Sequence, residues 1–308
     1  MRALYEFGKS AARASGGMVA EVITPVSRRR RTSIVQPGRR LYDFERHRTL
    51  ASSYGGHDPG VCACQHAALL DWVLGYPDRA VGSIEDALSI AQRLRHPLSL
   101  SHALIYSSIL HLFRGEAHAA LRRAEEAEAL SSEQLVARVV DTNILRGAAI
   151  FAGGELDQAV GSIRSGLAAR QSWQLARQYQ LTLVAEVLDR AGEHDNALAT
   201  IAEAEAAIQV GGDRWWEAEV HHRKGLIFLS QNQRTDGENA LRKSLKIARA
   251  QKAKSLELRA ATSLARLWGE NGRRADASEL LAPIYDWFTE GFGTTDIKKA
   301  KALLAELK

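Results

Sequence analysis

The sequence has few of the residues that interrupt helices or cross-link a chain. Its 308 residues include only six prolines, and none lies between Leu98 and Ala282. Proline inside a helix removes a hydrogen bond and clashes with the preceding turn, so this stretch is compatible with uninterrupted helices. The two cysteines, Cys62 and Cys64, are too few and too close together for a disulfide framework. These shortages exclude a small disulfide-stabilised fold.

Long apolar runs are also missing. No run reaches the roughly 20 residues of a membrane span, and the N-terminus lacks the apolar core of a secretory signal. We therefore expect a cytoplasmic protein that has no membrane partner.

Basic charge is concentrated at the start of the chain. Residues 1–40 contain nine Lys or Arg against two Glu, which leaves 32 basic against 34 acidic residues for 41–308. The first segment shows no sustained helical or strand period, so we predict a disordered basic arm at 1–40 and a repeat domain at 41–308. The consecutive arginines at 28–31 could attract phosphates. Such runs are more often simply solvated, and we expect no nucleic-acid partner.

A glycine followed five residues later by an alanine recurs at intervals of about forty residues. The pairs are Gly75/Ala80, Gly115/Ala120, Gly154/Ala159, Gly192/Ala197 and Gly272/Ala277, and Ala240 marks a further unit whose glycine is displaced to Gly237. Such a period is typical of stacked helical hairpins. Glycine suits the end of a first helix, where the backbone takes a positive φ, and alanine suits the place where the second helix crosses the first.

The recurring glycine–alanine pairs predict an all-α protein, an α-solenoid of about six tetratricopeptide-like helical hairpins over residues 60–290. The first hairpin pairs a helix near 60–74 with one near 77–95, in which Ala80, Ile84 and Ala87 follow a helical stripe. Residues 41–48 read as the end of a helix without its beginning, which would leave the apolar face of the first hairpin bare. Residues 294–308 are predicted to form a closing helix.

Several longer sequence segments indicate a more specific family resemblance. They lie at 47–51, 54–61, 72–78, 214–221, 253–267 and 281–292, and include RWWEAEVH at 214–221 and LAPIYDWFTEGF at 281–292. Over about residues 41–308 the chain resembles the C-terminal helical region of large bacterial proteins that join a class III adenylate cyclase domain to a signal-transducing ATPase domain. The spacing Leu74-Gly75-x4-Ala80 also resembles the tetratricopeptide repeat.

The resemblance implies a regulatory region of bacterial signal transduction, without the family's catalysis. Only the arm precedes the helical region here, and the phosphate-binding pattern G-x-x-x-x-G-K-[ST] does not occur. We expect a non-enzymatic interaction module without a cofactor, as a detached or truncated portion of such a protein or as a stand-alone regulator. The alternative is the sensory or regulatory part of a nucleotide cyclase system that acts with separately encoded cyclase or ATPase domains.

Three side chains are candidates for contact with a protein partner. Trp215 and Trp216 lie at the start of a predicted helix that contains His222, and aromatic anchors dominate binding energy at interfaces. The alternative is that the two rings fill a gap between the fourth and fifth hairpins, where the spacing widens between Ala197 and Ala240. The bare face of the first hairpin is a second candidate surface, for self-association.

His57, Cys62, Cys64 and His66 form a cluster with metal-ligand chemistry. The two cysteines fall about 200° apart on a helix, so we expect small buried cysteines and no metal site. We also expect no catalytic arrangement of Ser, His and an acid, because a helical solenoid separates residues that are distant in the sequence.

Overall fold

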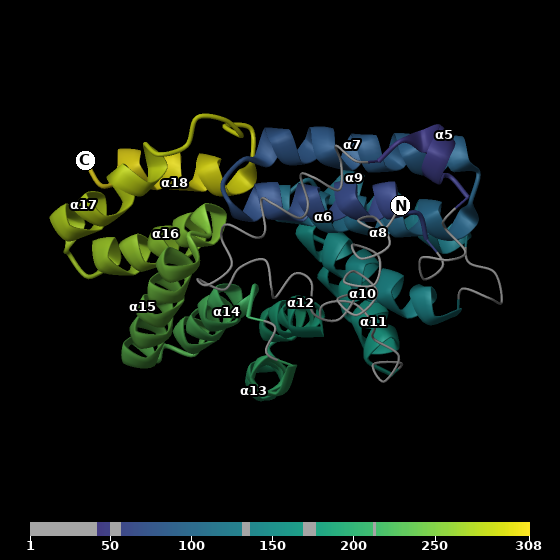
Figure 1. Ribbon diagram of the computed structural model, residues 1–308. Coiled ribbons are helices and arrows are strands. Elements are labelled where there is room, and N and C mark those ends of the chain that lie inside the picture. The colour runs from purple at the N-terminus through teal and green to yellow at the C-terminus, as the bar shows by residue number, and fades with distance from the viewer. Residues whose placement is uncertain (1–41, 50–56, 131–135, 169–176, 212–213) are drawn as a thin grey trace.

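The computed structural model describes residues 42–49, 57–130, 136–168, 177–211 and 214–308, and within these ranges all regular structure is helical (Figure 1). The predicted basic arm at 1–40 lies outside the described residues. The helices are α5 (Phe44–His47), α6 (Pro59–Val73), α7 (Pro77–Leu94), α8 (Pro97–Arg114), α9 (Ala117–Ala129), α10 (Val136–Ala152), α11 (Leu156–Ala168), α12 (Arg177–Arg190), α13 (His194–Gly211), α14 (Glu217–Ser230), α15 (Arg234–Gln251), α16 (Lys254–Glu270), α17 (Arg274–Tyr285) and α18 (Thr295–Glu306). None of these described helices is both long and apolar enough to cross a membrane.

Helices α6 to α17 form six antiparallel hairpins, α6/α7 through α16/α17, as predicted. Helix α18 packs against α16 and α17 and closes the array, also as predicted. Helix α5 differs from the expectation. The Asp43 carboxylate accepts a hydrogen bond from the backbone N–H of Arg46 and caps the helix, so this segment has its own beginning.

Each hairpin turns at one residue with a positive φ. These residues are Gly75, Gly115, Gly154, Gly192 and Gly272, with φ from 75° to 102°, and Asn232 in the fifth hairpin, with φ of 60°. Asparagine tolerates this conformation better than most side chains. The turn of the fifth hairpin is closed as the others are, because the Asn232 N–H donates to the carbonyl of Leu229 at 3.0 Å. Successive turn residues are therefore 40, 39, 38, 40 and 40 residues apart.

Asn232 corrects the predicted register of the fifth hairpin. Gly237 lies inside α15, five residues after Asn232, and so occupies the alanine position and not the turn position that we assigned to it. A Cβ at Gly237 would lie 3.2 Å from the carbonyl oxygen of Gly225 and 2.6 Å from a methyl carbon of Leu229. The glycine thus permits a close crossing of α14 and α15. The widened spacing after the fourth hairpin disappears, because Gly237 follows Ala197 by 40 residues.

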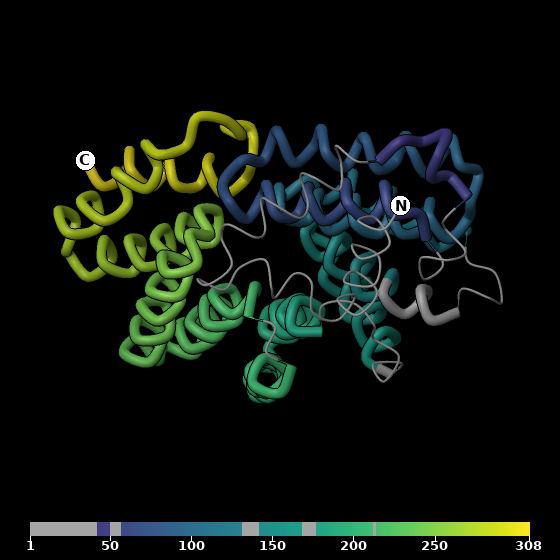
Figure 2. Tube along the Cα trace, in the orientation of Figure 1, coloured from purple at the N-terminus to yellow at the C-terminus, as the bar shows by residue number. Residues whose placement is uncertain are grey.

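The two ends of the array meet (Figures 1 and 2). Helix α16 contacts α6, and Ser255 Oγ donates a hydrogen bond of 2.6 Å to the carbonyl of Trp72. Beyond α17, the Glu290 carboxylate accepts from the backbone N–H of Asp78 at 2.8 Å, and Asp78 accepts from the N–H of Gly291 at 2.8 Å. The hairpins therefore close on themselves.

The first hairpin is not bare, contrary to the expectation. Helix α6 is buried over nearly its whole length. Helices α7, α8 and α16 contact it, and a Cβ at Gly60 would lie 2.7 Å from the ring of Tyr42. Self-association was expected because this apolar face would be exposed, and the structure removes that reason. Self-association itself stays a prediction.

Candidate functional site: a central cavity

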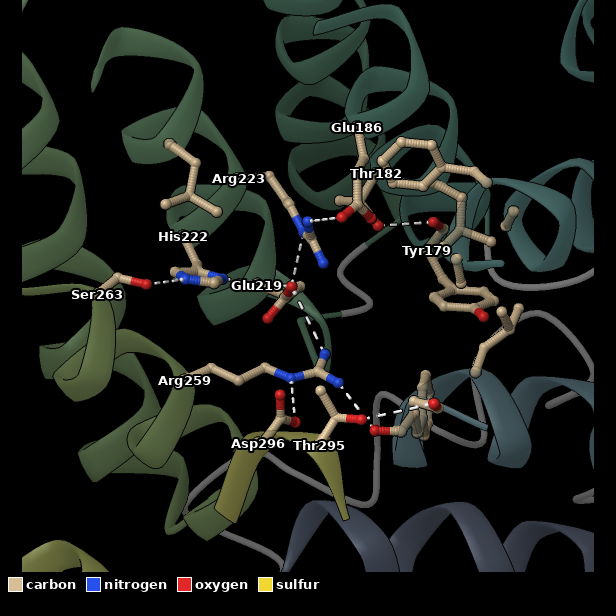
Figure 3. A pocket seen from close by; sticks show the side chains of 18 of the residues that line it. Tyr179, Thr182, Glu186, Glu219, His222, Arg223, Arg259, Ser263, Thr295 and Asp296 are labelled. Carbon is tan, nitrogen blue, oxygen red and sulfur yellow. Dashed lines mark hydrogen bonds and ion pairs between the residues drawn. The ribbon is translucent and has the colours of Figure 1, made fainter. Parts of the chain in front are cut away.

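A cavity of about 560 Å³ lies inside the closed array (Figure 3). Its wall comes from α8, α10, α12, α14 and α16, which are the first helices of five hairpins, and from α18. A cavity of this size holds a small ligand or a few residues of a peptide. The repeat thus places the first helices around a common interior.

A buried carboxylate, Glu219, is the centre of the polar wall. Only 1% of its side chain is exposed. Its Oε1 accepts a hydrogen bond of 2.9 Å from Arg223 Nε, and it lies 3.3 Å from His222 Nδ1 and 3.6 Å from Arg259 Nη1. Burial by itself raises the pKa of Glu219, but the attraction of His222, Arg259 and Arg223 outweighs burial and holds that pKa well below its ordinary value. Glu219 is therefore a fixed negative charge.

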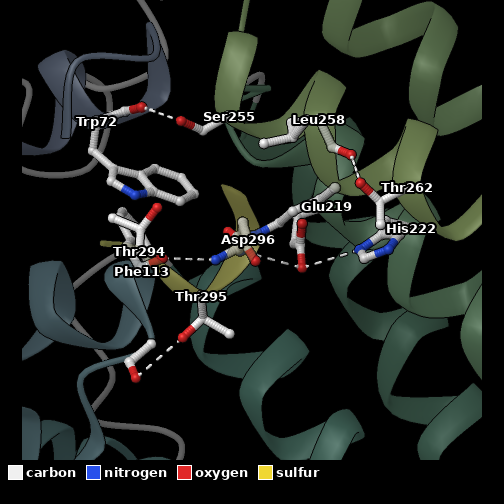
Figure 4. Close-up of polar contacts among 12 residues, drawn as sticks. Trp72, Phe113, Glu219, His222, Ser255, Leu258, Thr262, Thr294, Thr295 and Asp296 are labelled. Atoms are coloured by element: carbon white, nitrogen blue, oxygen red, sulfur yellow. Dashed lines mark hydrogen bonds and ion pairs between the residues drawn. The ribbon is translucent and has the colours of Figure 1, made fainter. Parts of the chain in front are cut away.

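Arg259 connects distant parts of the array: Figure 3 labels its side chain, and Figure 4 labels its partners Trp72, Phe113, Glu219 and Asp296. Its Nε donates a hydrogen bond of 2.7 Å to Asp296 on α18, and its Nη2 donates one of 2.9 Å to the carbonyl of Phe113 on α8. The guanidinium also lies over the ring of Trp72 on α6, 4.7 Å from the ring centroid. One side chain thus contacts the first, second and fifth hairpins and the closing helix.

Arg223 is the second guanidinium of the wall. It is hydrogen-bonded to Glu219 and forms an ion pair with Glu186 on α12. Burial lowers the pKa of Arg223, but these two carboxylates outweigh burial and raise it. These contacts use its Nε and Nη1 groups, and 20% of the side chain is exposed. Figure 3 shows the two guanidinium groups on opposite sides of Glu219.

Aromatic rings form part of the apolar wall. Trp216 stacks on Phe113 with ring centroids 4.9 Å apart, and it meets Tyr179 edge-on at 5.2 Å. The indole Nε1 of Trp216 donates a hydrogen bond of 2.9 Å to Thr182 Oγ1, which satisfies a buried polar group. Because these rings come from α8, α12 and the start of α14, the cluster joins three hairpins that are not all neighbours in the sequence.

The three predicted partner-contact residues occupy different positions. Trp216 and His222 line the cavity, whereas Trp215 lies outside its lining. Trp215 and Trp216 are 1% and 2% exposed. Both rings therefore belong to the buried core, as the alternative expected, although they pack beside Tyr179 and Phe113 of other hairpins and not in a widened gap. Partner binding by these residues stays a prediction. For Trp216 and His222, the partner would have to enter the cavity, because that is where their side chains are accessible.

Ser263, His222 and Glu219 form a row on the wall, contrary to the expectation that a solenoid keeps such residues apart. Ser263 Oγ lies 2.9 Å from His222 Nε2, and His222 Nδ1 lies 3.3 Å from Glu219. The order is that of a hydrolase triad, but Glu219 is already paired with two arginines. Ser263 also lies inside α16, where the backbone N–H groups bond within the helix and cannot form an oxyanion hole. We interpret the row as a network that orients Glu219.

Cys62, Cys64 and His66 lie on α6, which does not line the cavity. Burial raises the pKa of Cys62 to about 12, so its thiol stays protonated at neutral pH. His66 Nδ1 lies 2.7 Å from the Cys62 carbonyl oxygen, and the ring of His57 stacks on that of His102 at 4.2 Å. In the described part of the chain, no three His, Cys, Asp or Glu side chains are placed to hold a metal ion.

The charged residues of the wall were not predicted from the sequence. Glu219 shares a helix face with Trp216 and His222, which lie three residues to either side of it. A charged residue on a helix face of otherwise buried side chains could therefore have identified Glu219 as a candidate site residue. No comparable signal pointed to Asp296, because its partner Arg259 lies in a different part of the sequence.

No protein-family model matches the sequence. An uncharacterized protein of Rhizobium meliloti (strain 1021) is 25% identical over 243 residues, which are 76% of this chain and 23% of that protein. The chain therefore spans less than a quarter of the length of the curated relative that it matches.

A crystal structure of a Rap protein complexed with Competence and Sporulation Factor has a similar architecture. The TM-score is 0.63 at 11% sequence identity, and the match covers 100% of this chain and 80% of that chain. At this identity the likeness concerns the fold alone. Together with the six hairpins, it confirms the predicted all-α solenoid of tetratricopeptide-like hairpins.

Proposed function

We propose that the chain is a non-enzymatic, regulatory protein-interaction module that binds a short segment of a partner protein in the central cavity. The observation that carries this proposal is the cavity, in which an aromatic wall and a charged wall converge from six helices on about 560 Å³. Ligand sites typically combine an apolar lining with a few positioned polar groups.

The size of the cavity favours a segment over a folded domain. An interface between folded proteins buries about 800 Å² on each partner over a broad surface, whereas this cavity has room for a few residues. The similar Rap protein was crystallised in complex with Competence and Sporulation Factor. That complex supports the idea that such an array can hold a ligand.

Filling the cavity tests the proposal. Ala152 is exposed at the end of α10 and lines the cavity, so Ala152→Trp would obstruct it without replacing a buried residue. Ala129→Trp, at the exposed end of α9 and outside the lining, is the matched control. We expect proteins cross-linked to the tagged chain in its own cells to be retained by the wild type and by Ala129→Trp, and lost with Ala152→Trp. Equal capture by all three folded forms would contradict binding in the cavity.

A second candidate is that the partner is a separately encoded cyclase or ATPase domain. The family resemblance supports it, and so does the much longer rhizobial relative, in which a similar region is part of a larger chain. The test uses cyclase or ATPase domains encoded next to this gene. We expect such a domain to bind the chain and to change its rate of nucleotide turnover when bound. An unchanged rate without binding would exclude this partner.

A further inference from the structure

We propose that the cavity recognises an acidic peptide segment, with carboxylate side chains beside an apolar one. The inference rests on the proposed function and adds the chemistry of the ligand. It depends on which charges of the wall are already paired and which are not.

The carboxylates of the lining are all paired with arginines. Glu186 pairs with Arg223, Asp296 pairs with Arg259, and Glu219 contacts both arginines. A cationic ligand would therefore find no carboxylate in the described wall without an arginine partner, although Glu219 Oε2 accepts no hydrogen bond there. It would compete with the arginines for these partly or fully buried ion pairs, whose disruption is costly.

Two cations of the lining are in the opposite situation. Arg190 at the end of α12 and Lys299 on α18 line the cavity, and neither forms an ion pair or hydrogen bond within the described part of the chain. Both side chains are exposed. They lie where an approaching anion can reach them from solvent, so the unpaired charge among the described lining residues is positive.

Deeper in the wall, two further groups offer hydrogen bonds to an anion. A guanidinium has five N–H donors, and the contacts of Arg223 with Glu219 and Glu186 use its Nε and Nη1 groups. Tyr179 is 2% exposed and lines the cavity, and its hydroxyl has no hydrogen-bond partner among the described residues. A carboxylate supplies the acceptors for both groups, and charge-assisted bonds of this kind are strong away from bulk water.

The apolar wall explains why the ligand is a peptide segment and not a free anion. Phe113, Phe151, Leu183, Trp216 and Leu226 all line the cavity. Burying an apolar side chain against them adds the favourable term that a small anion cannot provide. Acidic and apolar side chains that alternate along a short segment would contact both walls.

Selection from random short peptides displayed on phage tests this inference with the full chain as bait. We expect acidic peptides with an apolar residue to be enriched, and their binding to weaken as salt is added. The double substitution Arg190→Gln/Lys299→Gln should weaken a selected peptide about tenfold, or about 1.4 kcal/mol. The control Arg122→Gln/Lys298→Gln removes the same charge from exposed residues outside the lining and should leave binding unchanged.

The other outcomes separate this inference from the proposed function. Enrichment of neutral or basic peptides that Ala152→Trp abolishes would overturn the acidic ligand and leave segment binding in the cavity intact. Free glutamate binding as tightly as the selected peptides would show a small-anion site and overturn the peptide. If no selected peptide is sensitive to Ala152→Trp, both the inference and the proposed function fail.

Discussion

A hydrogen bond of 2.9 Å joins the guanidinium of Arg259 to the backbone carbonyl of Phe113, although 146 residues separate them in the sequence. The carbonyl belongs to the last turn of α8, where carbonyl groups have no partner within the helix. Arg259 also holds Asp296 on the closing helix and approaches Glu219 in the wall. The closure of the array and the shape of the cavity therefore depend on the same side chain.

Removing the charge of Arg259 should destabilise the chain strongly. Arg259→Met leaves Glu219 and Asp296 with one cation fewer, and breaking a buried ion pair costs about 3–5 kcal/mol. We expect the free energy of unfolding to fall by about that amount in urea denaturation. Arg266→Met is the control, because Arg266 is 49% exposed and 3.9 Å from Glu306; its effect should be within about 0.5 kcal/mol. Equal effects of the two substitutions would contradict the role assigned to Arg259.

Glu219 should make the protein more stable at neutral than at acid pH. Its pKa in the folded chain lies well below the ordinary value of 4.5, so the unfolded chain binds the proton more readily. The stabilisation is complete above that ordinary value and is lost as the pH falls through the folded pKa. We expect the free energy of unfolding of the wild type to exceed that of Glu219→Gln, by a margin that shrinks below about pH 4.5.

Urea denaturation of both proteins across this pH range measures the margin. His221 adds its own pH dependence, because burial lowers its pKa to about 4, but this contribution is present in both proteins and cancels in the difference. A margin that stays constant, or grows toward acid pH, would show that Glu219 is not held ionised by its neighbours.

Gly237 should resist a substitution that normally stabilises helices. Replacing glycine by alanine inside a helix usually gains about 0.5–1 kcal/mol, and we expect this gain for Gly82→Ala on α7, where a Cβ meets no atom within 4 Å. At Gly237 the new methyl would contact Leu229 and the backbone of Gly225. Gly237→Ala should therefore lower the free energy of unfolding by about 1–3 kcal/mol. Stabilisation by both substitutions in thermal unfolding would contradict the close crossing of α14 and α15.

The hairpins were predictable because their signals are local. Gly75 and Ala80 each meet a requirement of a single turn or a single crossing, and the same requirement recurs in each unit. The fifth hairpin was misread because Asn232 meets the turn requirement without being glycine. The closure could not be predicted, because the approach of α16 to α6 is the sum of many small rotations between hairpins. The pairing of Arg259 with Asp296, and with it the charged wall, follows only from that closure.

The row of Ser263, His222 and Glu219 should be catalytically inactive. Both arginines hold Glu219, and the backbone around Ser263 offers no oxyanion donors. We expect the purified chain to hydrolyse neither ATP nor an activated ester and to form no cyclic AMP. Turnover that persists through purification and disappears in Ser263→Ala would overturn the non-enzymatic proposal.

The closure of the array is the central claim, and cross-linking between positions 78 and 290 tests it most directly. The Glu290 carboxylate lies 2.8 Å from the backbone nitrogen of Asp78. In a background with Cys62→Ala and Cys64→Ala, we expect Asp78→Cys/Glu290→Cys to be joined within one chain by a short bismaleimide. Asp78→Cys/Asp195→Cys should not be joined, because α13 lies far from α7 in Figure 1. Absence of the 78–290 cross-link, although both cysteines react with a simple maleimide, would contradict the closed array.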